Sequence, residues 1–268
     1  MNEDTPKDLV EAGRGYENLF VPALFEPWTK HLVDSANIQE GSTVLDVACG
    51  TGVLARCALA RAGASGQVVG ADPAPGMLAV ANEIEPAINW ILCSAEALEV
   101  SDCAFDCVLS QFGMMFFEDR KKAAEEMFRV LKPGGSLAIA VWRSVEHNPA
   151  YADIISVLEQ HVGEDAADAL RMPFGLGNAE EVVAALEGGG FTEVEVEAKT
   201  ESARFASSRQ MVEAELRGWL PLFGILLEED QLDKVLIESD KSLEKYALAS
   251  GEALFPTSAY IFTAHRIW

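Results

Sequence analysis

The sequence predicts an α/β fold in which a mainly parallel sheet carries helices on both faces. Two observations support this prediction. Strand-like and helix-like stretches alternate between residues 43 and 142, and such alternation builds a parallel sheet. In addition, the apolar stretch VLDVA at residues 44–48 leads into the turn Cys49–Gly52, after which a helix-like stretch begins. A strand that passes through glycines into a helix is typical of nucleotide-binding α/β folds.

The hydrophobic pattern gives the elements in chain order. Residues 1–15 are polar and predict a loose segment, and Tyr16–Ala36 predicts an amphipathic helix interrupted by Pro22 and Pro27. The alternating core follows, with strands at Thr43–Ala48, Gln67–Ala71, Ile88–Cys93, Phe105–Ser110 and Ser136–Trp142. Its helices are Leu54–Ala62, Gly76–Glu83 and Asp119–Leu131.

After Trp142 the pattern becomes mainly helical. The predicted helices are Asn148–Val162, Asn178–Leu186, Arg209–Trp219 and Glu229–Ala249, and the predicted strands are Thr192–Lys199 and Ala259–Arg266. Asn178 and Glu181 have the spacing of a capping box, and Arg171–Gly177 predicts an irregular link. We expect one domain with an N-terminal helical cap at residues 1–40, a cofactor-binding core at 41–145, and helical lid segments at 146–180 and 200–250 that form the substrate pocket.

The glycine turn and a following carboxylate together predict a cofactor that contains a ribose. Gly50 and Gly52 allow a sharp turn and a close approach to the backbone. The next strand ends in Asp72, 22 residues beyond Gly50, where two acceptor oxygens suit the two hydroxyls of a ribose. The stretch from Gly50 to Ala55 also fits the dinucleotide pattern G-x-G-x-x-G/A, so the turn alone leaves a pyrophosphate possible.

Asp46 favours one of these two alternatives. It lies four residues before the first glycine, at the end of the first predicted strand. A carboxylate there repels a pyrophosphate but attracts an ammonium group, and an ammonium on a ribose-bearing cofactor indicates S-adenosylmethionine.

With these motifs, the sequence resembles the class I S-adenosylmethionine-dependent methyltransferases. Further stretches carry the resemblance in family order: DPAPGM at 72–77, SAE at 94–96, FDCVLSQF at 105–112 and RVLKPGGSL at 129–137. The resemblance covers residues 41–145. It is of the type found in the small-molecule branch that includes the ubiquinone and menaquinone biosynthesis methyltransferases. It implies a Rossmann-like doubly wound sheet of seven strands, mostly parallel with an antiparallel last strand.

The resemblance also implies the cofactor-binding residues. Around the methionyl part and the ribose these are Tyr16, Asp46, Ala48, Gly50, Gly52, Asp72 and Pro73. Near the adenine and toward the acceptor they are Met77, Ser94, Ala95, Glu96 and Gln111. Many relatives have an aspartate in place of Ser94, whose hydroxyl, or the backbone of Ala95, can still accept from the adenine. The cofactor would leave as S-adenosylhomocysteine.

The substrate pocket is expected from apolar side chains and possible anchors beyond the fourth and fifth strands. The sulfur-rich and aromatic residues Phe112, Met115 and Phe116 follow the fourth strand, where open α/β folds bind ligands. Arg143 and Arg171 are candidate anchors for a carboxylate, with ion pairs inside the protein as the alternative. His147 is the candidate general base for an acceptor that must lose a proton, with a solvated or structural role as the alternative.

Composition restricts the class of partner. The 268-residue chain has 43 acidic and 20 basic residues and a formal charge of −23, a field that opposes nucleic acid. The five cysteines lack metal-ligand spacing, so we expect reduced thiols and no metal. The acidic start and the lack of a long apolar run predict a cytoplasmic protein without membrane insertion, monomeric or homodimeric.

The proposed activity is methylation of a small hydrophobic metabolite, with O- or C-methylation favoured over N-methylation. Two other classes stay open from the sequence. One is a methyltransferase-like protein that binds the cofactor without methyl transfer, as a cyclase, decarboxylase or regulatory subunit. The other is an NAD-dependent oxidoreductase, which the glycine turn permits and Asp46 disfavours.

Overall fold

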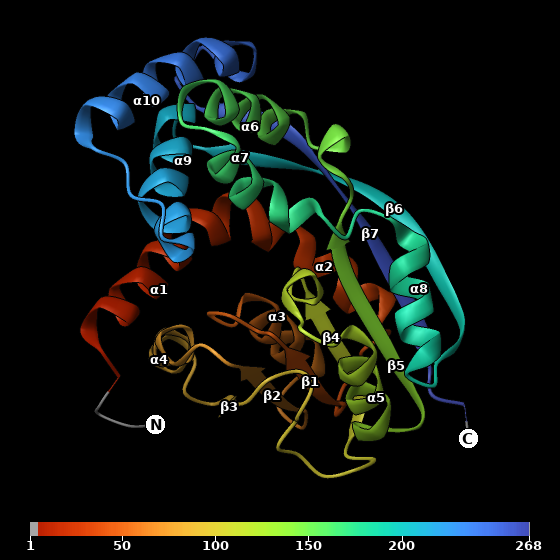
Figure 1. Ribbon diagram of the computed structural model, residues 1–268. Helices are drawn as coiled ribbons and strands as arrows, with labels where there is room; N and C mark the ends of the chain where they lie inside the picture. Colours follow the sequence, from red (N-terminus) through yellow and green to blue (C-terminus); the bar gives the residue numbers. More distant parts are fainter. Residues whose placement is uncertain (1–4, 268) are drawn as a thin grey trace. The chain divides into compact units, whose positions relative to one another are not determined.

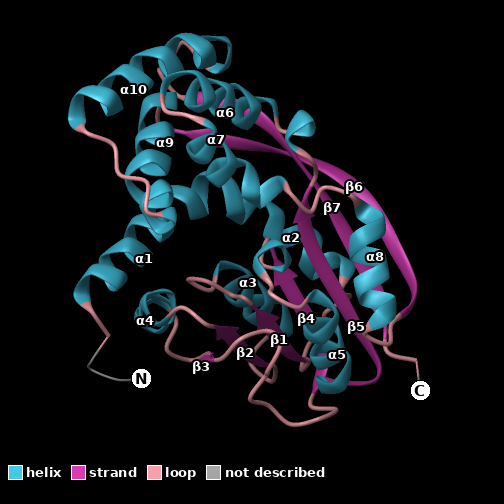
Figure 2. Ribbon diagram, in the orientation of Figure 1, coloured by secondary structure: helices cyan, strands magenta, loops and turns pink. Residues whose placement is uncertain are grey.

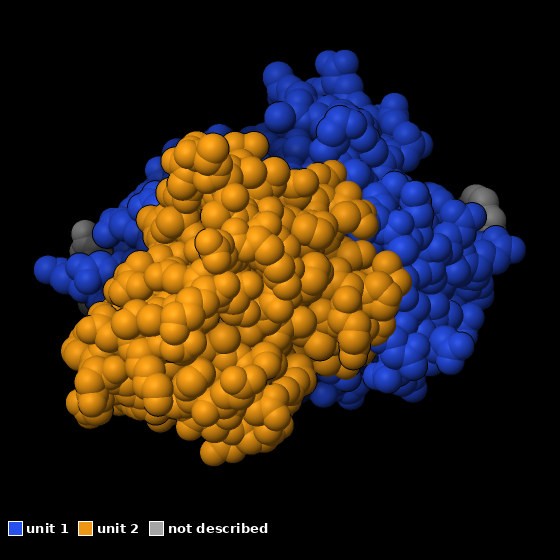
Figure 3. All heavy atoms as spheres, turned by 90° about the horizontal axis from the view of Figure 1, so that it is seen from above, with its two compact units in different colours: residues 1–141, 178–199, 259–268 blue, residues 142–177, 200–258 orange. Residues whose placement is uncertain are grey.

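The computed structural model describes residues 5–267. These residues form two compact units (Figure 3). Among the described residues, unit 1 comprises 5–141, 178–199 and 259–267, and unit 2 comprises 142–177 and 200–258. The latter ranges overlap the segments expected to form the lid and substrate pocket.

Unit 1 contains the predicted sheet. Among the described residues the sheet has seven strands in the order β3-β2-β1-β4-β5-β7-β6 (Figure 1). Their bounds are β1 Thr43–Val47, β2 Gln67–Asp72, β3 Asn89–Leu92, β4 Phe105–Gln111, β5 Leu131–Trp142, β6 Thr192–Phe205 and β7 Ala253–His265. Strands β1 to β5 pair in parallel, and β7 runs antiparallel to β5 and β6. The predicted fold class, with its antiparallel last strand, is confirmed.

Helices surround these strands (Figure 2). Those of unit 1 are α1 Lys7–Phe20, α2 Glu26–Ser35, α3 Val53–Ala62, α4 Pro75–Ile84, α5 Arg120–Val130 and α8 Ala179–Gly188. Helix α1 packs against α4, α2 against α3, and α5 against α8. Strand β1 is bordered by β2 and β4, so its residues Val44, Leu45 and Val47 are buried. The carboxyl end of β1 therefore opens into the glycine turn from the middle of the sheet.

The N-terminal prediction needs two corrections. Residues 7–15 are helical, and only residues 1–4 of the expected loose segment lie outside the described residues. The two prolines do not break the helical path, because Pro22 lies in the first turn of a π-helical segment at Val21–Phe25 and Pro27 in the first turn of α2. The hydrogen-bonding pattern changes from α- to π-helical at Val21–Phe25, where Pro22 has no N–H to donate to the regular pattern.

Unit 2 is mainly helical. Its helices are α6 Pro149–His161, α7 Glu164–Arg171, α9 Ser208–Ala214 and α10 Glu229–Leu243, with a π-helical segment at Glu215–Trp219 after α9. Helix α7 was not predicted, and α10 ends before the predicted Ala249. Strands β6 and β7 are longer than predicted and continue from unit 1 into unit 2. In unit 1, the Asn178 half of the predicted capping box of α8 is confirmed, since the Asn178 side chain accepts the backbone N–H of Glu180 at 3.1 Å.

Candidate functional site

The glycine turn and Asp72 form one hydrogen-bonded unit at the carboxyl ends of β1 and β2. The backbone N–H of Gly50 donates to Asp72 Oδ2, and that of Ala74 donates to Asp72 Oδ1, both at 2.8 Å. Asp72 is 7% exposed, and burial raises the pKa of its carboxyl group. Each oxygen has accepted one hydrogen bond and keeps capacity for a second. The carboxylate therefore stabilises the turn and can still accept two hydroxyls.

Asp46 is a buried carboxylate without a hydrogen-bonding partner. It is 1% exposed, and neither of its oxygens is hydrogen-bonded among the described residues. Burial raises the pKa of Asp46 well above its ordinary value and Asp72 adds to the rise, while the Ala55 amide and Arg56 oppose it. The backbone amide of Ala55 lowers the pKa of Asp46, although it does not meet the geometry of a hydrogen bond to either oxygen. An uncompensated carboxylate in this position favours a positively charged group at the turn.

Tyr16 brings α1 onto the turn. A Cβ built on Gly50 would lie 4.0 Å from the Tyr16 ring, and Gly50 has a left-handed φ of 55°. The Tyr16 ring stacks on Phe25 with 5.2 Å between centroids. Burial, followed by the charge of Asp72, raises the pKa of the Tyr16 hydroxyl. The structure thus places Tyr16 beside Gly50 and near both acidic side chains.

Gly52 has a different reason from Gly50 to be glycine. Its φ is 86°, and a Cβ there would lie 2.3 Å from the Trp90 ring. The same ring would meet a Cβ on Gly70 at 2.3 Å. Trp90 therefore occupies the space next to Gly52, and internal packing accounts for that glycine without a ligand.

The end of β4 provides the next group of predicted residues. Gln111 Nε2 donates to the backbone oxygen of Phe25 at 3.0 Å, while its buried Oε1 has no partner among the described residues. Ala48 and Phe112 both adopt left-handed φ angles, of 56° and 55°. A Cβ on Gly113 would lie 2.5 Å from that of Ala48. The backbone is thus strained and closely packed where β1 and β4 end, as is common at functional sites.

The remaining predicted residues of unit 1 lie in neighbouring segments. Pro73 directly follows Asp72 and is exposed. Met77 lies in α4 and is half-buried. Ser94 is half-buried and Ala95 buried in the loop that follows β3. The carboxylate of Glu96 accepts the backbone N–H of Glu118 at 3.0 Å, which ties this loop to the start of α5. The cofactor roles of these residues stay predictions.

Aromatic and sulfur side chains follow β4. Phe112 packs edge-on against Trp28, with 5.7 Å between ring centroids, and is buried. Met115 is buried and Phe116 is 46% exposed in the 3-10 segment Met114–Phe116. Their role as pocket walls stays a prediction.

The predicted residues of unit 2 have partners within that unit. His147 is exposed in a 3-10 turn, and its Nδ1 lies 3.1 Å from Ser144 Oγ. Arg143 Nη1 donates to Ser258 Oγ at 3.3 Å. Arg171 pairs with Glu159, Glu164 and Asp168, the ion-pair alternative considered for it. Its role as a substrate anchor stays a prediction.

Two charged groups were missed from the sequence. Glu215, 7% exposed, accepts the Tyr151 hydroxyl at 3.2 Å in unit 2, and burial raises its pKa to about 7. Arg56 in α3 pairs with Glu17 at 2.6 Å and donates to the backbone oxygen of Thr51 at 2.7 Å. The only signal for Glu215 in the sequence is an acidic residue among apolar ones within the predicted helix Arg209–Trp219. Arg56 lies one turn after Gly52, a spacing that points it back to the turn.

Comparison with known proteins assigns the family. The family model described as the ubiE/COQ5 methyltransferase family matches residues 19–154. The chain belongs to the ubiE/COQ5 methyltransferase family. The resemblance to class I methyltransferases of the ubiquinone and menaquinone branch is thereby confirmed, and the chain is placed in a family of enzymes.

Curated relatives support the same assignment over part of their length. The ubiquinone/menaquinone biosynthesis C-methyltransferase UbiE of Serratia proteamaculans is 40% identical over 118 residues, covering 42% of this chain and 47% of the relative. UbiE of Pasteurella multocida is 38% identical over 118 residues, covering 42% of this chain and 44% of the relative. The chain spans about half the length of the curated relatives it matches.

Solved structures match the fold more widely. A phosphoethanolamine N-methyltransferase 2 of Haemonchus contortus, in complex with phosphomonomethylethanolamine and S-adenosylhomocysteine, has a TM-score of 0.59 and 19% identity over 97% of this chain and 58% of its own. The YcgJ protein of Bacillus subtilis has a TM-score of 0.57 and 16% identity over 90% of this chain and 98% of its own. At these identities the matches confirm the fold. Within residues 5–267, none of the helices is long and apolar enough to span a membrane.

Proposed function

We propose that this protein is an S-adenosylmethionine-dependent methyltransferase that acts on a small apolar acceptor. The observation that carries the proposal is the pair of buried carboxylates on the glycine turn. Asp46 provides an uncompensated negative charge, and Asp72 provides two fixed acceptor oxygens. S-adenosylmethionine carries an ammonium group, a sulfonium charge and a ribose diol, which are complementary to these groups.

The same residues disfavour a dinucleotide. A pyrophosphate at a glycine turn needs free backbone N–H groups and no nearby anion. Here Gly50 donates its N–H to Asp72, and the buried carboxylate of Asp46 lies in β1 just before the turn. We therefore rank an oxidoreductase well below the methyltransferase.

Each part of the cofactor has matching residues in unit 1. Asp72 would accept from the ribose, while Asp46 would favour the methionyl ammonium through its charge, since its oxygens are out of contact with solvent. Met77, Ser94 and Ala95 would border the adenine, and Glu96 holds their loop against α5. Tyr16 would cover the methionyl end beside Gly50.

The chemistry asks the protein mainly for positioning and for exclusion of water. The bound cofactor would supply a methyl group activated by its sulfonium, and the neutral thioether of S-adenosylhomocysteine would be the leaving group. The chain would hold the acceptor in line with that methyl group, and the apolar Phe112 and Met115 suit a flat acceptor. The names of the curated relatives favour a ring carbon of a quinone-type acceptor, with a hydroxyl oxygen second. An acceptor that must lose a proton would require a base, for which His147 stays the candidate.

Calorimetric titration with S-adenosylmethionine, S-adenosylhomocysteine and NAD(H) tests the proposed cofactor. We expect saturable binding of the first two and none of NAD(H); binding of NAD(H) alone would overturn the proposal. Incubation with S-adenosylmethionine and a short-chain naphthohydroquinone then tests the reaction. Methyl transfer produces S-adenosylhomocysteine in step with the methylated ring, whereas a cyclase or decarboxylase leaves the cofactor unchanged.

A further inference from the structure

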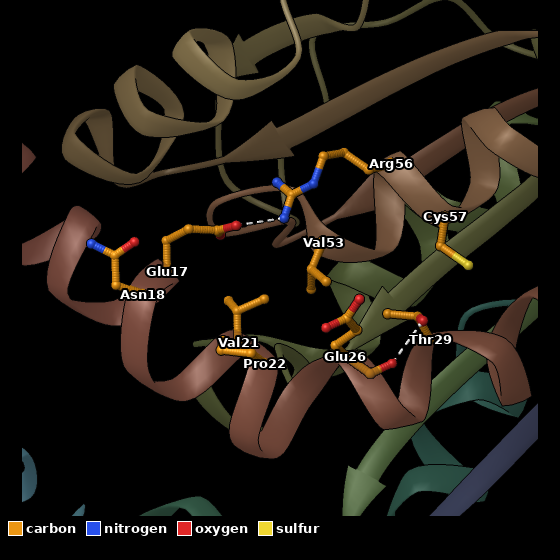
Figure 4. Close-up of a pocket in the computed structure, with 9 residues that line it drawn as sticks. All are labelled: Glu17, Asn18, Val21, Pro22, Glu26, Thr29, Val53, Arg56 and Cys57. Atoms are coloured by element: carbon orange, nitrogen blue, oxygen red, sulfur yellow. Dashed lines mark hydrogen bonds and ion pairs between the residues drawn. The ribbon is translucent and has the colours of Figure 1, made fainter. Parts of the chain in front are cut away.

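A cavity lies in unit 1, bordered by residues that follow the glycine turn. It has a volume of about 530 Å³ and is bordered by the N-terminal helical segment and the beginning of α3 (Figure 4). The volume is in the range of small-molecule sites. Asp46, Gly50 and Asp72 do not line it. The cavity is therefore distinct from the group of residues assigned to the cofactor.

The guanidinium group that borders the cavity is already engaged. Arg56 Nη2 pairs with Glu17 Oε1 at 2.6 Å, and Arg56 Nη1 donates to the backbone oxygen of Thr51 at 2.7 Å. Figure 4 shows the Arg56 side chain reaching toward Glu17 across one end of the cavity. Its charge therefore compensates the Glu17 carboxylate and leaves little for an anionic ligand.

Two carboxylates, those of Glu17 and Glu26, line the cavity together with the guanidinium group of Arg56. Glu17 Oε2 is buried and has no hydrogen-bonding partner among the described residues, in a side chain that is only 16% exposed. Glu26 is exposed, and its carboxylate points toward Val53 and the cavity (Figure 4). Two acids and one base give the lining side chains a formal charge of −1. With Glu17 paired to Arg56, the net negative charge of the lining lies on the exposed carboxylate of Glu26.

We propose that this cavity binds a small organic cation, an ammonium group on an apolar body. The ammonium group contacts the accessible carboxylate of Glu26, which carries the net negative charge of the lining. The apolar body lies against Val21, Val53 and Cys57, which line the same cavity. No part of this inference requires S-adenosylmethionine, so it can be tested independently of the proposed function.

Cys57 gives a direct readout of occupancy. It lines the cavity and is partly exposed, whereas Cys103 is exposed and does not line it. We would measure alkylation of both thiols by iodoacetamide with peptide mass spectrometry, with and without benzylammonium chloride. At about ten times the dissociation constant, the cation should slow Cys57 about tenfold by mass action and leave Cys103 unchanged. Benzyl alcohol, which lacks the charge, should protect Cys57 far less.

A matched pair of variants separates the cavity from the general acidity of the protein. Glu26→Gln removes the accessible carboxylate of the cavity, and Glu180→Gln removes one exposed charge on α8. The first should raise the benzylammonium concentration needed for half-maximal protection by about tenfold or more, as expected for a charged hydrogen bond, and the second should not. The proposal is overturned if benzylammonium gives no protection, if benzyl alcohol protects equally, or if both variants weaken protection alike.

Discussion

The carboxyl edge of the sheet in unit 1 and the helices of unit 2 each bury a carboxylate, but the two are stabilised by different kinds of partner. Asp72 accepts two backbone N–H groups, from Gly50 and Ala74, within the strand-turn-helix motif. Glu215 accepts the hydroxyl of Tyr151, 64 residues away in the sequence and on another helix. The first arrangement follows from local backbone geometry. The second exists only because separate helices pack together.

This difference indicates that Asp72, and not Glu215, is suited to bind a ligand. Asp72 keeps acceptor capacity after its two hydrogen bonds, and neither oxygen of its neighbour Asp46 has a hydrogen-bonding partner among the described residues. Glu215 is surrounded by side chains such as Tyr151, whose ring packs 5.1 Å from that of Phe174. We therefore expect changes at the sheet edge to alter cofactor binding, and changes at Glu215 to alter stability and its pH dependence.

The largest effect is expected for Asp72→Ala. Loss of two hydrogen bonds from hydroxyls to a charged acceptor should weaken S-adenosylmethionine binding by about 1,000-fold, measured by calorimetry. The variant also loses the acceptor for Gly50 and Ala74, so circular dichroism must show that the fold is retained. An affinity within a factor of about two of the unchanged protein would refute the ribose assignment.

Glu215→Gln should change stability and leave cofactor affinity alone. The pKa of Glu215 is about 7 in the folded protein against an ordinary value of 4.5, so folding favours its protonated form. Its contribution is fully present below the unfolded pKa and is lost as pH rises from about 4.5 to about 7. The variant should therefore be more stable above pH 7 by about 1 to 3 kcal/mol, with little difference near pH 4. Urea unfolding at both pH values measures this, and an equal difference at both would contradict it.

A smaller and opposite pair of effects is expected for Asp46→Asn. Burial raises the pKa of Asp46, which means that its charged form destabilises the folded protein at neutral pH. Asparagine carries no such charge, so the melting temperature of the variant should be higher. It should also weaken S-adenosylmethionine binding by about tenfold, since the ammonium loses an attractive charge. If the variant is less stable and binds normally, Asp46 is a structural residue.

The smallest effect is expected for His147→Ala. The side chain is exposed and hydrogen-bonded only locally, to Ser144, among the described contacts. The melting temperature should therefore stay within about 1 °C, as for most surface substitutions. Turnover of an identified acceptor then decides its role: unchanged turnover removes His147 as a base, and loss of turnover with normal cofactor binding supports it.

The local rules of the sequence were sufficient for the first part of the chain. The strand Thr43–Val47, the glycine turn and Asp72 lie close to where the pattern predicts them, because each depends on residues that are near in sequence. The interpretation of Gly52 needed the structure, since Trp90 comes from a separate strand and packs on it. The cofactor roles of the predicted residues await the titrations above.

The second part of the chain was less predictable. Helix α7 was missed, because the buried face of Glu164–Arg171 consists mainly of small alanines such as Ala166 and Ala167, with Leu170 as its one large apolar side chain. Strands β6 and β7 run beyond their predicted ends, since pairing between distant segments, and not local alternation, sets where a long antiparallel strand stops.

The amino-acid sequence was enough to determine the parallel α/β architecture, the glycine turn and the two aspartates beside it, since short-range periodicity and backbone geometry encode them. Only the tertiary structure decided that Asp46 lacks a partner, that Arg56 joins Glu17 to the turn, and that Glu215 meets Tyr151. The physical reason is that burial and pairing are properties of three-dimensional neighbours, and these neighbours are brought together by packing between elements distant in sequence.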